Sequence, residues 1–182
     1  MTRLLEAISF GRFSSKPQER GDSYKRQQEA YNRVCLRYSH RCTPSERYVF
    51  GSFFGVGESG LHARHNGKGG SLKRLIDLMG AGVIRAGEVC MVVEAFDRLS
   101  RMQPDLAVGL LSELVRGGCP VVVDSPDLWI DPEDLGGHKF ILIAAMVQLA
   151  HSESLQKSAR AREQWAAARK KGGSGAARKL PY

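Results

Sequence analysis

The amino-acid sequence predicts an α/β fold in which helices flank a mostly parallel central sheet, followed by a long C-terminal helix. Strand-like and helix-like segments alternate along the chain, which is typical of parallel sheets with helical crossovers. Val89–Ala95 is a near-continuous apolar run, as expected of a central strand that is covered on both faces. Near the C-terminus, a helical pattern from about Gly137 to Lys171 covers roughly 35 residues, which would extend about 50 Å.

The other strands are predicted from short runs of β-branched, aromatic and aliphatic residues bounded by turn residues. These runs are Leu5–Phe13, Arg47–Phe54 and Pro120–Asp124. The glycine-rich segment Gly55–Gly70 is predicted to be a loop, and so is Ser125–Asp134.

The other helices are predicted where apolar residues recur every three or four positions. The first runs through Tyr24–Tyr38 after a capping residue at Asp22 or Ser23. Leu72–Met79 and Pro104–Arg116 show the same periodicity. Each of these helices therefore has an apolar side that can cover the sheet.

The length of 182 residues suits one α/β core with an appended helix. We expect a catalytic core over residues 1–136, a long helix over 137–171, and a flexible basic tail or the start of a linker over 172–182. Phe140–Leu149 is apolar all round, so this half of the long helix needs two partners, one of which can be another subunit.

Composition excludes several classes of protein. The longest apolar stretch is shorter than the roughly 20 residues that a membrane span needs, and the N-terminus lacks the plan of a signal peptide. The four cysteines contain no CxxC pair, so we expect reduced thiols and a cytoplasmic protein. Membrane, secreted and zinc-finger classes are therefore largely excluded.

The formal net charge of +8 is spread unevenly. Residues 1–80 carry a net +7, residues 81–150 a net −5, and residues 151–182 a net +6. Two basic ends are compatible with a polyanionic partner such as DNA, and equally with a solvated helix face and a basic tail.

Two polar clusters follow predicted strands. Asp97–Arg101 comes directly after the apolar strand, at the edge where open parallel sheets place their ligands. Its two arginines, three positions apart, can offer forked donors to a phosphate, although a salt-bridge cluster at a helix start is the alternative. Arg12–Ser15 follows the first strand and belongs at the same edge. A serine hydroxyl beside guanidiniums indicates attack on phosphorus, while Ser14 alone reads as a turn or cap residue.

Other motifs carry less weight. Gly55–Gly60 spells G-x-G-x-x-G, but no helix is predicted to begin there, which disfavours a dinucleotide site. The five histidines form no evident metal-ligand set. A phosphate- or nucleotide-binding α/β domain without relation to any enzyme on DNA is the least favoured of three hypotheses for this chain.

Five segments together resemble a known family. FGRFSSKPQ, SYKRQ, GESG, VVEAFDRLSR and ESLQKSAR occur in the order and spacing of the catalytic domain of serine site-specific recombinases, the resolvase/invertase family. The phage-integrase-like large serine recombinases look most similar. The resemblance covers about Ala7 to Lys171 and implies a resolvase-like fold.

The resemblance implies a role for individual residues. Ser14 matches the nucleophile of the family. The family's other catalytic residues are matched here by Arg12, Asp97, Arg98 and Arg101. A further arginine that the family carries after its S-G loop has two candidates here, Arg64 and Lys68, and the usual tyrosine before Arg12 is Phe10. The remaining residues expected at the DNA phosphate are Gln18, Gln27, Ser59, Glu153 and Arg160.

The resemblance also implies the reaction and the partners. Serine attacks a DNA phosphate and forms a 5′-phosphoserine, and a second transesterification rejoins the strands without metal or cofactor, so guanidiniums supply the positive charge. The partners are double-stranded DNA and a homodimer that assembles into a tetramer; no membrane and no small-molecule substrate is expected. Since family members carry a C-terminal DNA-binding domain, we expect a catalytic-domain fragment or a truncated product that cannot choose its own site. The alternative is a non-catalytic DNA-binding or assembly remnant of this fold.

Overall fold

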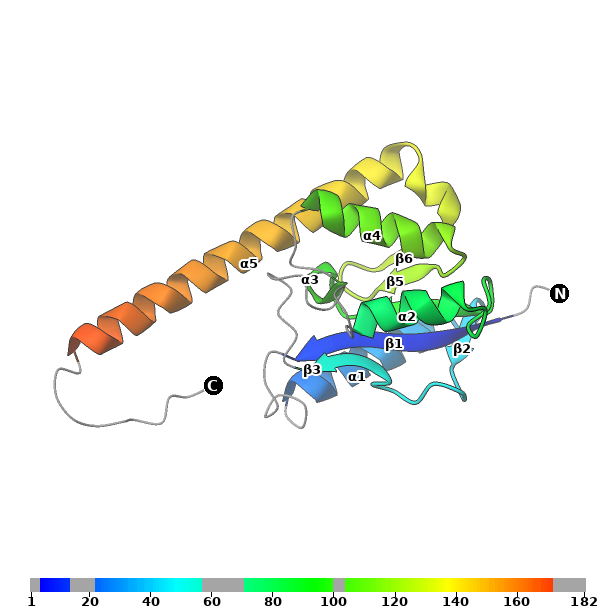
Figure 1. Ribbon diagram of the computed structural model, residues 1–182, viewed down its shortest axis with the longest axis horizontal. Coiled ribbons are helices and arrows are strands. Elements are labelled where there is room, and N and C mark those ends of the chain that lie inside the picture. The colour runs from blue at the N-terminus through cyan, green and yellow to red at the C-terminus, as the bar shows by residue number, and fades with distance from the viewer. Residues whose placement is uncertain (1–3, 14–21, 57–70, 100–103, 172–182) are drawn as a thin grey trace.

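A computed structural model describes residues 4–13, 22–56, 71–99 and 104–171 of the chain (Figure 1). An α/β body carries one long helix that projects well beyond it. Neither the body nor the helix offers a membrane span within these ranges, because no helix there is long and apolar enough.

The sheet is built around β1 (Leu5–Phe13) and is mostly parallel, as predicted. β1 pairs in parallel with β4 (Val89–Val93) on one side. On its other side it pairs first with β2 (Cys42–Pro44) and then with β3 (Phe53–Val56), both parallel. β4 continues in parallel to β5 (Val121–Val123), and only the edge strand β6 (Leu128–Ile130) is antiparallel.

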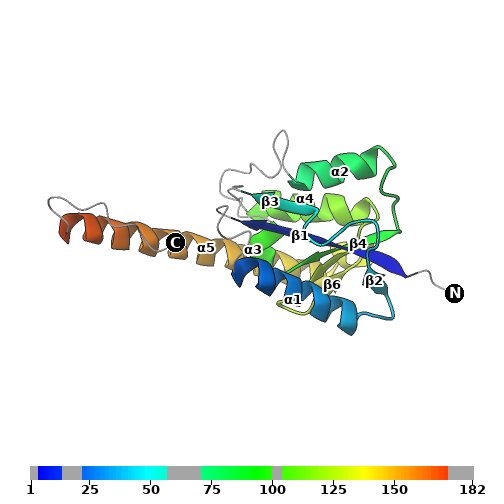
Figure 2. The same cartoon turned by 90° about the horizontal axis from the view of Figure 1, so that it is seen from below.

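Helices cover both faces of this sheet (Figures 1 and 2). α1 (Asp22–Arg37) lies on one face, and α2 (Ser71–Gly80) and α4 (Pro104–Arg116) lie on the other. The short α3 (Phe96–Leu99) follows β4, and a 3₁₀ helix, η4 (Pro132–Leu135), leads into α5. α5 (His138–Lys171) has 34 residues and begins one residue after the predicted start at about Gly137.

Alternating side chains of the strands divide the core into two clusters. On β4, Met91 and Val93 pack in the cluster beneath α2, α4 and α5, whereas Cys90 and Val92 pack in the cluster beneath α1. All five β4 residues are buried, which confirms a central strand covered on both faces. Ile143 of α5 is fully buried in the first of these clusters.

Several predicted bounds need correction. Of Arg47–Phe54, only the last two residues are strand, because the chain turns at Gly51 (φ +92°) and Ser52 N–H bonds back to Val49. Ser125–Asp134 is not a simple loop, since it contains β6 and most of η4, and β2 was not predicted at all. β2 and β6 are three residues long, which is too short to show periodicity, and their pairing with β1 and β5 determines them.

α5 docks on the body through one side of its first half. Ile143 and Val147 are buried there, whereas Ile141, Leu142 and Leu149 are 68%, 49% and 59% exposed. The body therefore covers only part of this all-round apolar segment. Beyond Ser158, every α5 residue whose burial the structure describes is exposed.

Candidate functional site

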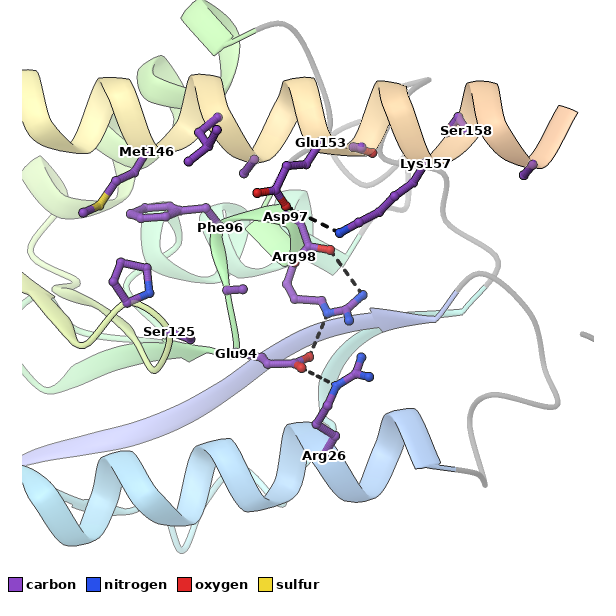
Figure 3. Close-up of a pocket in the computed structure, with 16 residues that line it drawn as sticks. Arg26, Glu94, Phe96, Asp97, Arg98, Ser125, Met146, Glu153, Lys157 and Ser158 are labelled. Atoms are coloured by element: carbon purple, nitrogen blue, oxygen red, sulfur yellow. Dashed lines mark hydrogen bonds and ion pairs between the residues drawn. The ribbon is translucent and has the colours of Figure 1, made fainter. Parts of the chain in front are cut away.

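The candidate site lies where β4 ends and α3 begins, at the carboxyl edge of the parallel sheet. β4 ends at Val93, and the next five residues bring Glu94, Asp97 and Arg98 to this edge. α3 packs against both β1 and α5, so the short helix is held between the central strand and the long helix (Figure 3). This is the edge at which open α/β sheets bind their ligands.

Glu94 holds two arginines from different elements. The Nε of Arg98 donates a hydrogen bond to Glu94 Oε2 at 2.9 Å, and the Nε of Arg26, on α1, donates to Glu94 Oε1. The Arg98 and Glu94 side chains are only 15% and 14% exposed, whereas Arg26 is 53% exposed. Arg98 Nη1 also lies 3.7 Å from Asp97 Oδ2. Figure 3 shows the Glu94 carboxylate between the two guanidiniums.

These residues line a cavity of about 950 Å³ between α1, α3, α5 and the turn after β5. Ser125 and Pro126 close one side, and Phe96, Met146 and Leu149 give it an apolar wall. Its ionisable lining within the described ranges is Arg26, Arg98 and Lys157 against Glu94, Asp97 and Glu153. Three positive and three negative formal charges cancel, so these groups give the cavity no net attraction for a polyanion.

Of the two α5 residues predicted at the DNA phosphate, Glu153 lines this cavity and Arg160 does not. Glu153 Oε2 lies 3.5 Å from Lys157 Nζ, one turn further along the helix. Ser154, between them, is buried and also lines the cavity. Arg160 is exposed and lies further along α5 than the residues that line the cavity, apart from Ala161.

Gln27 is buried against the end of β1. Its Nε2 donates to the backbone oxygen of Ser23 at 3.1 Å, and its buried Oε1 has no hydrogen-bond partner within the part of the chain that the structure describes. A Cβ placed on Gly11 would lie 2.1 Å from that Oε1. Gly11 therefore makes room for Gln27 beside Arg12, whose backbone pairs in register with Gly55.

The structure thus brings together only part of the predicted set. Asp97, Arg98 and Glu153 share the cavity, and Gln27 and the backbone of Arg12 belong to the neighbouring α1 and β1. The other predicted residues lie outside the described ranges: Ser14, Gln18, Ser59, Arg64, Lys68 and Arg101.

Sequence reasoning missed Arg26 and Glu94. Both lie inside segments that carry the resemblance to the family, Arg26 in SYKRQ and Glu94 in VVEAFDRLSR. The only signal for Glu94 is a carboxylate placed directly after a buried apolar strand, and no local pattern links it to Arg26, 68 positions away.

Nothing in the described ranges forms a cluster of three or more His, Cys, Asp or Glu side chains that could hold a metal ion. The four cysteines are free and buried. Burial raises the pKa of the Cys119 thiol to about 12, so this thiol stays protonated at neutral pH. Cys119 is therefore a core residue rather than a nucleophile.

Fold and site define a mostly parallel α/β domain with an arginine–carboxylate cluster at the carboxyl edge of its sheet. Residues 7–174 match the family model described as Resolvase, N terminal domain. The chain belongs to this family of serine recombinases, which act on DNA, so the resemblance noted from the motifs is confirmed. A search of the curated proteins found no match to the chain.

Proposed function

We propose that this chain is an active site-specific recombinase, of the integration, excision or inversion type, that cuts and rejoins DNA through a 5′-phosphoserine at Ser14. One observation carries the proposal: Arg98 is held in a cavity at the carboxyl edge of the sheet, and the neighbouring strand β1 ends at Phe13, the residue before Ser14 in the sequence. Membership of the resolvase family supports the same reading.

The proposed chemistry conserves bonds. Ser14 Oγ attacks a backbone phosphorus, the phosphorus–Oγ bond forms, the bond to the 3′ oxygen breaks, and the serine proton is passed on to that oxygen. The 3′ hydroxyl of the exchanged strand then attacks the phosphoserine, and a proton returns to Ser14. Arg12, Arg98 and Arg101 would stabilise the charge that grows on the phosphate oxygens. Asp97 either orients an arginine or protonates the leaving oxygen.

Recombination also needs two duplexes held together, and we propose that dimers of this chain pair into a tetramer on DNA. The exposed apolar residues Ile141, Leu142 and Leu149 support a contact between subunits along α5. The exposed second half of α5, with Arg160, Arg162 and Arg169, would follow the DNA backbone. In this proposal, residues 1–136 are the catalytic core and 137–171 the assembly helix, with 172–182 as a tail or linker.

The test is the formation of a covalent protein–DNA complex. The chain is incubated with supercoiled plasmid and with nicked duplex, and adducts are resolved in SDS. We expect an adduct that blocks the 5′ end and leaves an extendable 3′ hydroxyl, and that disappears in Ser14→Ala. The matched control is Ser15→Ala, which should keep the adduct. An unchanged adduct in Ser14→Ala would overturn the proposal.

A second function is favoured by the balanced charges of the cavity. Because carboxylates already pair Arg26 and Arg98, the chain could instead be a non-catalytic DNA-binding or assembly remnant. That reading expects salt-sensitive DNA binding and self-association with no adduct from the unmodified chain. The same SDS experiment therefore separates the two functions.

A further inference from the structure

Both oxygens of one carboxylate are used at the candidate site. Glu94 accepts from Arg98 through Oε2 and from Arg26 through Oε1, so groups from α3 and α1 meet at the end of β4. The Glu94 side chain is 14% exposed, and its pairing with two guanidiniums offsets the cost of removing most of its charge from water. The Glu94 side chain is therefore held in place by two arginines and is not a solvated surface charge.

The contact with Glu94 uses one particular side of Arg98. A guanidinium carries five N–H donors in a rigid plane, and a bidentate contact to phosphate uses two parallel ones. Glu94 occupies the Nε donor of Arg98. Nη1 of Arg98 lies 3.7 Å from Asp97 Oδ2, an ion pair that is longer than a hydrogen bond. The bond to Glu94 therefore fixes the plane through Nε and does not use the two terminal nitrogens, which can turn to a phosphate with Asp97 beside Nη1.

The same carboxylate lowers the positive charge of the site. Arg26 and Arg98 together carry +2, and Glu94 and Asp97 cancel it. A phosphate that enters the cavity is attracted by the guanidiniums and repelled by Glu94 at close range. Glu94 should therefore favour the reaction through orientation and disfavour DNA binding through charge.

We propose that Glu94 is a positioning residue, which holds Arg98 by its Nε so that the two terminal nitrogens of Arg98 face the scissile phosphate. This inference rests on the proposed recombinase function. It predicts opposite effects on two quantities, the affinity for DNA and the rate of strand cleavage. A residue that only maintained the fold would lower both together.

The experiment compares Glu94→Gln and Glu94→Ala with the unmodified full chain. Glutamine keeps the size but replaces one acceptor with a donor, so it cannot hold both arginines, and alanine holds neither. Affinity is measured by fluorescence anisotropy on a 30-base-pair duplex of arbitrary sequence, and the rate by adduct formation on supercoiled plasmid. We expect both variants to bind the duplex about two- to fivefold more tightly. We expect adducts to form at least about tenfold more slowly, with alanine slower than glutamine.

Glu113→Gln is the matched control, because Glu113 is exposed on α4 away from the cavity and its loss changes net charge equally. It should leave the adduct rate unchanged. An adduct rate for Glu94→Ala equal to that of the unmodified chain would overturn the inference, as would affinity and rate falling together. Thermal melts show whether each variant folds. If Glu94→Ala does not fold, the adduct rate and the affinity of Glu94→Gln are compared with those of the unmodified chain.

A spectroscopic measurement keeps this test independent of catalysis. In ¹⁵N-labelled chain, the Arg98 Nε–H should give a slowly exchanging signal that persists when the duplex is added and is lost in Glu94→Ala. If the unmodified chain forms no adduct, the proposed function fails, but this signal still decides whether Glu94 holds Arg98. Loss of the signal on adding the duplex would show that phosphate displaces Glu94, which contradicts a positioning role.

Discussion

Arg98 Nε donates to Glu94 Oε2 at 2.9 Å, across the junction between β4 and α3. Arg98→Lys should therefore lower adduct formation by roughly a hundredfold or more, because one ammonium cannot bind Glu94 and offer a planar fork to phosphate. The rate is measured on supercoiled plasmid. Arg116→Lys, at the exposed end of α4, is the control and should keep the full rate. Rates within twofold for the two variants would contradict a forked contact.

Gly11→Ala should destabilise the fold and disturb the site. The added Cβ would lie 2.1 Å from Gln27 Oε1 and 2.9 Å from the Phe54 ring, so both side chains must move. We expect a loss of about 1–3 kcal/mol in the free energy of unfolding, measured with urea. Gly109→Ala, with open space around it on α4, should instead raise stability by about 0.5–1 kcal/mol. Equal stability of the two variants would show that the fold tolerates a Cβ at position 11.

The attachment of α5 to the body can be tested with two isoleucines that lie two positions apart. Ile143 is fully buried and Ile141 is 68% exposed. Ile143→Ala should lower the free energy of unfolding by about 2–5 kcal/mol, through lost burial and the cavity left behind. Ile141→Ala should change it by less than about 0.5 kcal/mol. Denaturation of the dilute chain measures both, and similar losses would mean that α5 is docked differently.

The start of α5 should show a stabilising contact that acid removes. Lys139 Nζ donates to Asp134 Oδ2 at 2.7 Å and to the backbone oxygen of Trp129 at 2.8 Å. Burial alone would raise the pKa of Asp134, but the hydrogen bond from Lys139 and the one from the Asp131 N–H outweigh it, and the pKa is lowered. The ionised carboxylate therefore stabilises the fold above its ordinary pKa of 3.8, and this contribution is lost as pH falls through the lowered value.

Lys139→Ala should accordingly cost about 1–2 kcal/mol at pH 7 and less near pH 2.5. Urea midpoints across this range measure the difference. Lys25→Ala, on the exposed side of α1, is the control and should change stability little at either pH. A Lys139→Ala cost that is the same at both pH values would show that Asp134 makes no ionic contribution.

Much of the fold was predictable because its signals are local. β1 and α4 have the predicted bounds. The aliphatic and aromatic content of β1 and the three-to-four residue periodicity of α4 each lie within one segment. The strands β2 and β6 were missed because three residues show no period, and their partners in the sheet determine them. The apolar half of α5 was predicted, but not which of its residues are buried.

The candidate site divides in the same way. The sequence alone predicted Asp97, Arg98 and Glu153 as site residues from their motifs, and it identified the family by the order of those motifs. Only the tertiary structure decided that Arg26 and Arg98 share Glu94, because parallel pairing and the packing of α1 join residues 68 positions apart. A motif records which groups a site contains, whereas their charge balance and orientation depend on neighbours that the chain supplies only when folded.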